Sequence, residues 1–238
     1  MKRDHDTAGP VSPTATSNRS LPHDLAGFNS LAEGLDYAAR GVTGFNFYSA
    51  RGQLQSVLSY AELRRQAVST ARKLLSLGLK RGDRVAVVAE TGPEFMAVFF
   101  GCQYAGLVPC PVPYSMYIGG KESYVERVAG MLSAARAGTV IAGDDLLSHI
   151  AEAAARAGVF RVLSHAALAA LPEAAAKLEP FGAEEEAYIQ YSSGSTSSPK
   201  GVLISQKAII ANARGILREG LRLTPEDRAF SWLPLYHD

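Results

Sequence analysis

The chain has 238 residues, 47% of them hydrophobic, and a formal net charge of +1. That length can bury a sizeable core, in one large domain or two smaller ones. The near-zero charge, without a dense Lys/Arg run, argues against a nucleic-acid-binding protein, which usually presents a basic face. No run of 18 apolar residues is present, so neither a transmembrane helix nor stable membrane insertion is expected.

Residues 1–26 are expected to form a disordered tail. They start with a charged segment and continue in Thr, Ser, Pro and Asn, a composition that buries too little apolar surface to fold. The tail lacks the apolar centre of a signal peptide. Cys102 and Cys110 are too far apart for a Cys-x-x-Cys motif and are expected to be free thiols in a reducing compartment. We therefore expect a cytoplasmic protein.

The first clear helix is predicted to start after Ser59. Ser59 and Glu62 form a capping box, in which the serine is the N-cap and the glutamate stands three residues later. Apolar residues follow at helical spacing as far as Leu74, and Gly78 stands where a C-terminal cap belongs.

Strands and helices then alternate. The apolar run at 85–89 is typical of a strand that is buried on both faces. Pro93 favours the first turn of a helix. A short strand is predicted at 107–110, and Pro111 and Pro113 are expected to stop it.

The alternation continues with a helix over 124–135, a strand at 139–142, a helix over 146–154 and a strand at 159–163. Strands separated by helices of this length imply parallel pairing with right-handed crossovers. The fold class is therefore predicted to be α/β, with helices on both faces of a parallel sheet over residues 45–180.

Residues 171–186 interrupt this pattern with prolines, a glycine and an acidic run, and they indicate a surface connection. We place a boundary within it. Residues 27–182 are predicted to form an N-terminal α/β subdomain, and residues 183–238 a phosphate-binding loop and the start of a second subdomain.

Residues 188–205 read Tyr-Ile-Gln-Tyr-Ser-Ser-Gly-Ser-Thr-Ser-Ser-Pro-Lys-Gly-Val-Leu-Ile-Ser. A strand-like entry leads into small residues, which permit tight turns and close approach of a ligand. Their N–H groups and the hydroxyls of Ser193, Ser195 and Thr196 could surround phosphate oxygens. Lys200 adds a positive charge at a fixed distance, so the segment predicts a polyphosphate cradle.

Two alternatives to the cradle are a flexible Ser/Gly linker and a Walker A loop. A linker needs neither the Pro-Lys-Gly that ends this segment nor the flanking strands. A Walker A loop places its lysine after a glycine and at the start of a helix. Here Lys200 follows Pro199 and leads into an apolar strand-like run, so the order of residues is wrong.

The segment resembles the phosphate-loop signature of the adenylate-forming superfamily, Ser-Gly-Ser/Thr-Thr-Gly-x-Pro-Lys-Gly. This superfamily includes acyl-CoA synthetases, peptide-synthetase adenylation domains and luciferases. The matching residues are Ser193, Gly194, Ser195, Thr196, Pro199, Lys200 and Gly201. Ser197 departs from the usual glycine, and serine at this place is familiar among the fatty acyl-AMP ligases.

Three other stretches, 58–63, 99–109 and 230–238, also resemble this family. The last, Phe-Ser-Trp-Leu-Pro-Leu-Tyr-His-Asp, is similar to the Trp-Leu-Pro-x-x-His-Asp signature of fatty acyl-AMP ligases and their near relatives. The resemblance covers about residue 28 to the end. It implies the N-terminal part of the large domain of the adenylate-forming ligase fold, with mostly parallel sheets flanked by helices.

The resemblance implies that a medium- or long-chain fatty acid attacks ATP, forms acyl-AMP and pyrophosphate, and is passed to an acyl carrier protein. ATP and Mg²⁺ are the implied cofactors, and Lys200 and His237 the implied catalytic residues. The residues expected to contact ATP are Ser192, Ser193, Gly194, Ser195, Thr196, Ser197 and Lys200. No metal ligand is assigned, because the histidines lack partners at metal-ligand spacing. Trp232 is expected to belong to the core.

Several alternatives stay open at this point. The acceptor could be coenzyme A, the substrate could be an amino acid, or the chain could be a folded module that binds without catalysis. We expect the chain to be a fragment of a longer enzyme and inactive alone, because Asp238 falls inside a motif. The insertion that distinguishes the acceptors, and the acidic Mg²⁺ ligand, are expected beyond Asp238.

Overall fold

The structure, a computed structural model, describes residues 21–114, 120–192 and 200–236. The strands are β1 (Gly44–Tyr48), β2 (Leu54–Ser59), β3 (Arg84–Val88), β4 (Val108–Val112), β5 (Thr139–Ala142), β6 (Arg161–Ser164), β7 (Glu186–Ser192) and β8 (Lys200–Ser205). The helices are α1 (Leu31–Ala38), α2 (Tyr60–Ser76), α3 (Pro93–Ala105), α4 (Gly120–Ala135), α5 (Leu147–Arg156), α6 (His165–Ala169) and α7 (Gln206–Arg214), which continues into a π-helical segment, Gly215–Gly220. None of these helices is both long and apolar enough to cross a membrane.

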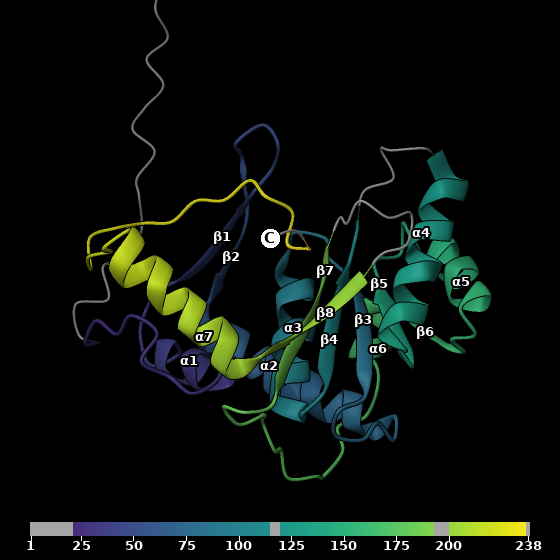
Figure 1. Cartoon of the computed structure of the whole chain (residues 1–238), viewed down its shortest axis with the longest axis horizontal. Helices are drawn as coiled ribbons and strands as arrows, with labels where there is room; N and C mark the ends of the chain where they lie inside the picture. Colours follow the sequence, from purple (N-terminus) through teal and green to yellow (C-terminus); the bar gives the residue numbers. More distant parts are fainter. Residues whose placement is uncertain (1–20, 115–119, 193–199, 237–238) are drawn as a thin grey trace, which may run out of the picture.

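The centre of the molecule is a four-stranded parallel sheet in the order β4-β3-β5-β6 (Figure 1). Val85, Val140 and Val162 lie in three of its strands, and all pair in parallel, so the predicted α/β fold is confirmed. The chain passes from β4 on one side of β3 to β5 on the other. Right-handed crossovers in opposite directions place α3 on one face of the sheet and α4 on the other.

Strand β3 divides the core into two clusters by the alternation of its side chains. Val85 and Val87 belong to the cluster that contains buried residues of α2 and α3. Ala86 and Val88 belong to the cluster that contains buried residues of α4 and α5. Both faces of the sheet are therefore covered by helices, which explains the continuous apolar run in the sequence.

The helix caps form as their residues predict. The Ser59 hydroxyl accepts a hydrogen bond from the Glu62 N–H at 3.1 Å, at the start of α2. Gly78 follows the end of α2 with φ of +79°, a conformation that glycine adopts at little cost. Pro93 is the first residue of α3, where its missing N–H is not needed.

Strand β4 does not stop at Pro111 as predicted, but continues to Val112. The Val108 N–H donates to the carbonyl of Asp83, next to β3, at 2.9 Å. Alternate residues point in opposite directions along a strand, so Pro109 and Pro111 turn their nitrogens away from β3. The prolines therefore remove no hydrogen bond from this ladder. Strand β7 lies beside β4 on that proline edge without joining the sheet.

The last strand of the sheet is displaced from its predicted range, 159–163, to Arg161–Ser164. Val159 instead completes the end of α5. Its N–H donates to the Ala154 carbonyl at 2.8 Å, its side chain is buried, and Gly158 before it has φ of +71°. A hydrophobic residue after a left-handed glycine is a common way to end a helix. Val159 therefore belongs to the end of α5 and not to the strand.

Residues 21–26 were included in the predicted tail, yet they contact the folded part of the chain. Ala26 is buried, and its carbonyl accepts hydrogen bonds from Arg214 Nε at 3.2 Å and Nη2 at 2.9 Å. The Tyr37 hydroxyl donates to the Pro22 carbonyl. Residues 1–20 lie outside the described residues.

Candidate functional site

Strands β7 and β8 form an antiparallel hairpin that flanks the predicted phosphate-binding loop. Ser192, the last residue of β7, pairs with Lys200, the first residue of β8. Both side chains are exposed. The residues of the loop itself, Ser193, Gly194, Ser195, Thr196 and Ser197 among them, lie outside the described residues, and their roles stay predictions. The structure therefore fixes the two ends of this loop as direct neighbours.

The two faces of the hairpin differ in character. Ile189 and Tyr191 point to the core cluster with α4 and α5, and the Tyr191 hydroxyl donates to the Met131 carbonyl of α4 at 2.8 Å. Burial raises the pKa of this tyrosine, so it stays a neutral hydrogen-bond donor. Residues that pair directly across two antiparallel strands share a face. Ser192 and Lys200 therefore lie on the opposite face from this core contact.

Gly201 occupies the position opposite Tyr191, on the face that turns toward the core. A Cβ atom built there would lie 2.8 Å from Ile189 Cγ2 and 3.5 Å from Tyr191 Cε1. A side chain at residue 201 would force Ile189 or the strand to shift. Packing thus explains why the Pro-Lys-Gly motif has a glycine at this position. The lysine before it points to the opposite face.

The segment that precedes His237 lies beside β7. Gln190, which shares a face with Ser192, donates from Nε2 to the Tyr236 carbonyl at 3.2 Å, across 46 residues of sequence. Tyr236 also packs against the core cluster of α2 and α3. His237 itself lies outside the described residues, and its catalytic role stays a prediction. Two separate motif segments, the strand before the loop and residues 230–236, therefore meet on one face.

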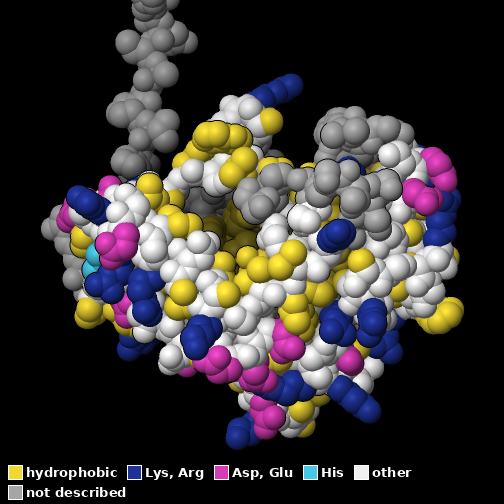
Figure 2. Space-filling model, viewed as in Figure 1, with side chains coloured by type: hydrophobic (Ala, Val, Ile, Leu, Met, Phe, Trp, Pro, Cys, Tyr) yellow, Lys and Arg dark blue, Asp and Glu magenta, His cyan; other side chains and the backbone are white. Residues whose placement is uncertain are grey.

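Hydrophobic side chains are exposed in the segment that leads to Tyr236 and on β8. Phe230 and Trp232 are 74% and 82% exposed, so the expectation that Trp232 belongs to the core is wrong. Val202 of β8, which pairs with Gln190 on this face, is about half exposed. Figure 2 shows that the molecular surface is hollowed on this side and that hydrophobic side chains gather in the hollow. The tryptophan was misassigned because residue type alone does not show whether an apolar segment has a partner within the chain.

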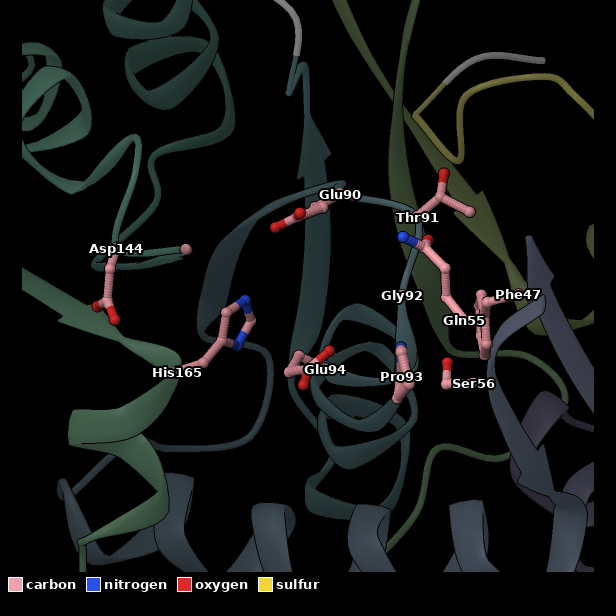
Figure 3. A pocket seen from close by; sticks show the side chains of 11 residues that line it. Phe47, Gln55, Ser56, Glu90, Thr91, Gly92, Pro93, Glu94, Asp144 and His165 are labelled. Atoms are coloured by element: carbon pink, nitrogen blue, oxygen red, sulfur yellow. The ribbon is translucent and has the colours of Figure 1, made fainter. Parts of the chain in front are cut away.

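A separate cavity of about 360 Å³ opens at the carboxyl ends of the parallel strands. Figure 3 shows Glu90 and Glu94 after β3, Asp144 after β5 and His165 after β6 around it. The cavity lies where the chain order reverses between β3 and β5, which is a common place for ligands in open α/β sheets. This cavity was not predicted from the sequence, although polar residues directly after predicted parallel strands indicate such a site.

The charge of this cavity disfavours a polyphosphate. Several carboxylates lie close together there. Burial raises the pKa of Glu90, and repulsion from the negative charges of Asp145 and Glu94 raises it further. Burial also lowers the pKa of His165, which reduces the positive charge available at neutral pH. A triphosphate placed there would meet carboxylates of the same sign. The exposed end of the hairpin, with Lys200, is the better match for anionic phosphate chemistry.

Neither a metal-binding cluster nor a reactive thiol is found among the described residues. Within residues 21–114, 120–192 and 200–236, no group of three or more His, Cys, Asp or Glu side chains could hold a metal ion. Cys102 and Cys110 are free and buried, and burial raises the pKa of Cys110 to about 12. A thiol with so high a pKa is not a nucleophile at neutral pH.

Comparison with known proteins gives consistent matches. The family of AMP-binding enzymes matches residues 44–238. A Caulobacter vibrioides (strain NA1000 / CB15N) protein, provisionally named an acyl-CoA synthetase, is 46% identical over 96% of this chain and 39% of its own length. The medium-chain-fatty-acid–[acyl-carrier-protein] ligase JamA of Moorena producens (strain JHB) is 29% identical over 89% of this chain and 36% of its own length.

A solved structure from a study of fatty acyl-adenylate ligases of E. coli and L. pneumophila superposes with a TM-score of 0.87. It is 44% identical and covers 91% of this chain. The matched region is 39% of that solved chain, so the present chain spans about two fifths of the length of the relatives it matches.

The steric role of Gly201 can be tested by a substitution. Gly201→Ala is expected to destabilise the chain by about 1–3 kcal/mol, because the added methyl group overpacks the contact with Ile189. Gly215→Ala is the matched control. Outside its own helix backbone and neighbouring residues, no atom lies within 4 Å of its added Cβ, and alanine is the better helix former. Urea unfolding followed by circular dichroism measures both, and equal stability of the two variants would contradict the packing argument.

Proposed function

The chain belongs to the AMP-binding enzyme family, and on that premise we propose that it supplies the phosphate-binding part of an ATP-dependent fatty acyl-AMP ligase. The observation that carries the proposal is the common face of the β7–β8 hairpin. That face has the paired ends of the loop, Ser192 and Lys200, and two residues away it has Gln190 in contact with the segment that leads to His237.

In the proposed reaction an oxygen of the fatty acid carboxylate forms a bond to the α-phosphorus of ATP. The bond from that phosphorus to the pyrophosphate leaving group breaks, and acyl-AMP and pyrophosphate are produced. Carboxylate and triphosphate repel each other, so the site must align them and balance their charge. Mg²⁺, when bound, supplies part of that charge, although none of its ligands is assigned among the described residues.

Lys200 contributes a fixed positive charge at the end of the loop. Its side chain is exposed, and none of the ion pairs among the described residues involves it, which supports a role in binding a phosphate oxygen. The loop residues from Ser192 to Ser197 are proposed to bind the β- and γ-phosphates through N–H and hydroxyl groups. His237 is proposed to lie near the carboxylate and the α-phosphate.

The proposed acceptor of the acyl group is an acyl carrier protein. The support is Ser197 in the loop, the Trp-Leu-Pro-Leu-Tyr-His-Asp segment, and the similarity to JamA, which is described as an acyl-carrier-protein ligase. Coenzyme A is the second candidate, favoured by the provisional name of the Caulobacter protein. Transfer from acyl-AMP to a holo-carrier protein, measured beside transfer to coenzyme A, separates the two. The cytoplasmic location stays a prediction.

The role of Lys200 is tested in the full-length parent protein. Lys200→Ala is expected to slow fatty-acid-dependent ATP–pyrophosphate exchange by roughly 10- to 150-fold, because it removes one hydrogen bond to a charged group, worth about 1.5–3 kcal/mol. Lys207→Ala is the control. Its ammonium group forms an exposed ion pair with Glu184 at 3.1 Å, and such pairs contribute little. If both variants exchange at the wild-type rate, Lys200 does not act on the phosphates.

The 238-residue chain alone is expected to form no acyl-AMP. It spans about two fifths of its relatives, and we propose that the remainder of the parent covers the exposed residues around Trp232 and completes the site. Groups that stabilise a transition state act together, so a partial site loses most of its rate. Purified chain is incubated with a long-chain fatty acid, labelled ATP and Mg²⁺. Acyl-AMP above the level of a Lys200→Ala control would contradict the proposal.

A further inference from the structure

Strand β7 contains a β-bulge near its start. Glu186 pairs with Ser205 and Tyr188 pairs with Ile204, so Ala187 is an extra residue without an opposite partner. A bulge shifts the register of every pair that follows it. The pairs from Tyr188 onward, including Ser192 with Lys200 at the mouth of the loop, depend on this one extra residue.

The side chain of Lys200 would face the wrong way without the bulge. If the pairing of Glu186 with Ser205 continued regularly, Lys200 would stand opposite Tyr191 instead of Ser192. It would then take the place of Gly201 on the core-facing side, where a Cβ added at Gly201 would lie 2.8 Å from Ile189 Cγ2. A slip of one residue moves a side chain to the other face of a strand.

Two buried glutamines hold the bulge. Gln103 of α3 and Gln206 of α7 are each 1% exposed. Gln103 Nε2 donates to the Ala187 carbonyl at 2.7 Å, and Gln206 Nε2 donates to the Glu186 carbonyl at 3.0 Å. Both carbonyls belong to the bulge, so side chains from two separate helices bind consecutive backbone groups there.

The two amides are also bound to each other and to the start of α1. Gln206 Nε2 donates to Gln103 Oε1 at 2.7 Å, and Gln206 Oε1 accepts from the Leu31 N–H at 2.9 Å. That N–H is at the first position of α1 and has no partner within its own helix. Buried amides are costly unless they are paired, so a network with this many partners favours one arrangement of the helices and the hairpin.

We propose that Gln103 and Gln206 are positioning residues for Ser192 and Lys200, the two residues that flank the phosphate-binding loop. They hold the bulge at Ala187, the bulge sets the register of β7 and β8, and the register presents Lys200 beside Ser192 on the open face. The effect on catalysis rests on the proposed function, whereas the effect on the hairpin does not.

The experiment uses Gln206→Met and Gln103→Met in the full-length parent, since methionine keeps the length of the side chain and removes the amide. Gln66→Met is the matched control. It removes a glutamine of α2 whose Nε2 donates to Glu62, away from the hairpin. Hydrogen exchange of the backbone amides is compared between β8 (200–205) and β3 (84–88), and the KM for ATP and for the fatty acid are measured by pyrophosphate exchange.

Each network variant is expected to speed exchange in β8 about tenfold or more, because a carbonyl of the bulge loses its partner, while β3 stays as in the wild type. The KM for ATP is expected to rise about tenfold and the KM for the fatty acid to stay within about twofold. Gln66→Met should change neither.

Three results would overturn the inference. The first is equal acceleration of hydrogen exchange in β8 and β3, which indicates a purely structural role. The others are unchanged hydrogen exchange in β8, and faster hydrogen exchange in β8 with an unchanged KM for ATP. If one variant fails to fold, the other is used, because each removes a single contact to the bulge. A wild-type parent without pyrophosphate exchange would refute the proposed function. The hydrogen-exchange comparison would still decide whether the glutamines hold the hairpin.

Discussion

The register of the β7–β8 hairpin is the constraint on which the candidate site depends. It decides which of two adjacent residues, Lys200 or Gly201, turns toward the core. A Cβ atom on the side of Ile189 would lie 2.8 Å from its Cγ2, so glycine is favoured there and the lysine points to the open face. The steric requirement for glycine on one face of the strand thus places the charge of Lys200 on the other face. The loop of small residues therefore has a cation beside it in a defined position.

The rest of the described fold holds this hairpin without merging it into the main sheet. The prolines of β4 leave the edge nearest β7 without N–H donors, so side-chain contacts take over the role of a ladder. On one side the Tyr191 hydroxyl reaches α4. On the other, the ring of Tyr188 contacts the tilted ring of Phe99 in α3, with centroids 5.9 Å apart, and Gln103 from the next turn of α3 binds the bulge. The parallel sheet is therefore a support for a hairpin that carries the chemistry.

The sequence predicted those features that depend on local patterns. The cap at Ser59, the helix start at Pro93 and the buried strands of the parallel sheet follow from neighbouring residues and short periodicities. The extent of β4 could not be predicted in this way, because the effect of a proline depends on which edge of the strand its nitrogen faces. The ends of the loop could be predicted from a recognisable motif. The face on which Lys200 lies could not, because it is set by a bulge that no local sequence pattern indicates. The contacts of Gln103 and Gln206 with the bulge could not be predicted either, because they join distant parts of the chain. A glutamine within the apolar run of α3 does, however, indicate a buried polar contact.

The most direct measurement is a crystal structure of the full-length parent with ATP, or with an acyl-adenylate analogue and pyrophosphate. The account predicts that Lys200 Nζ lies within hydrogen-bond distance of a phosphate oxygen, on the face of the hairpin where Gln190 contacts Tyr236. Phosphates bound in the acidic cavity beside Glu90, or a Lys200 side chain turned to the Ile189 face, would contradict it.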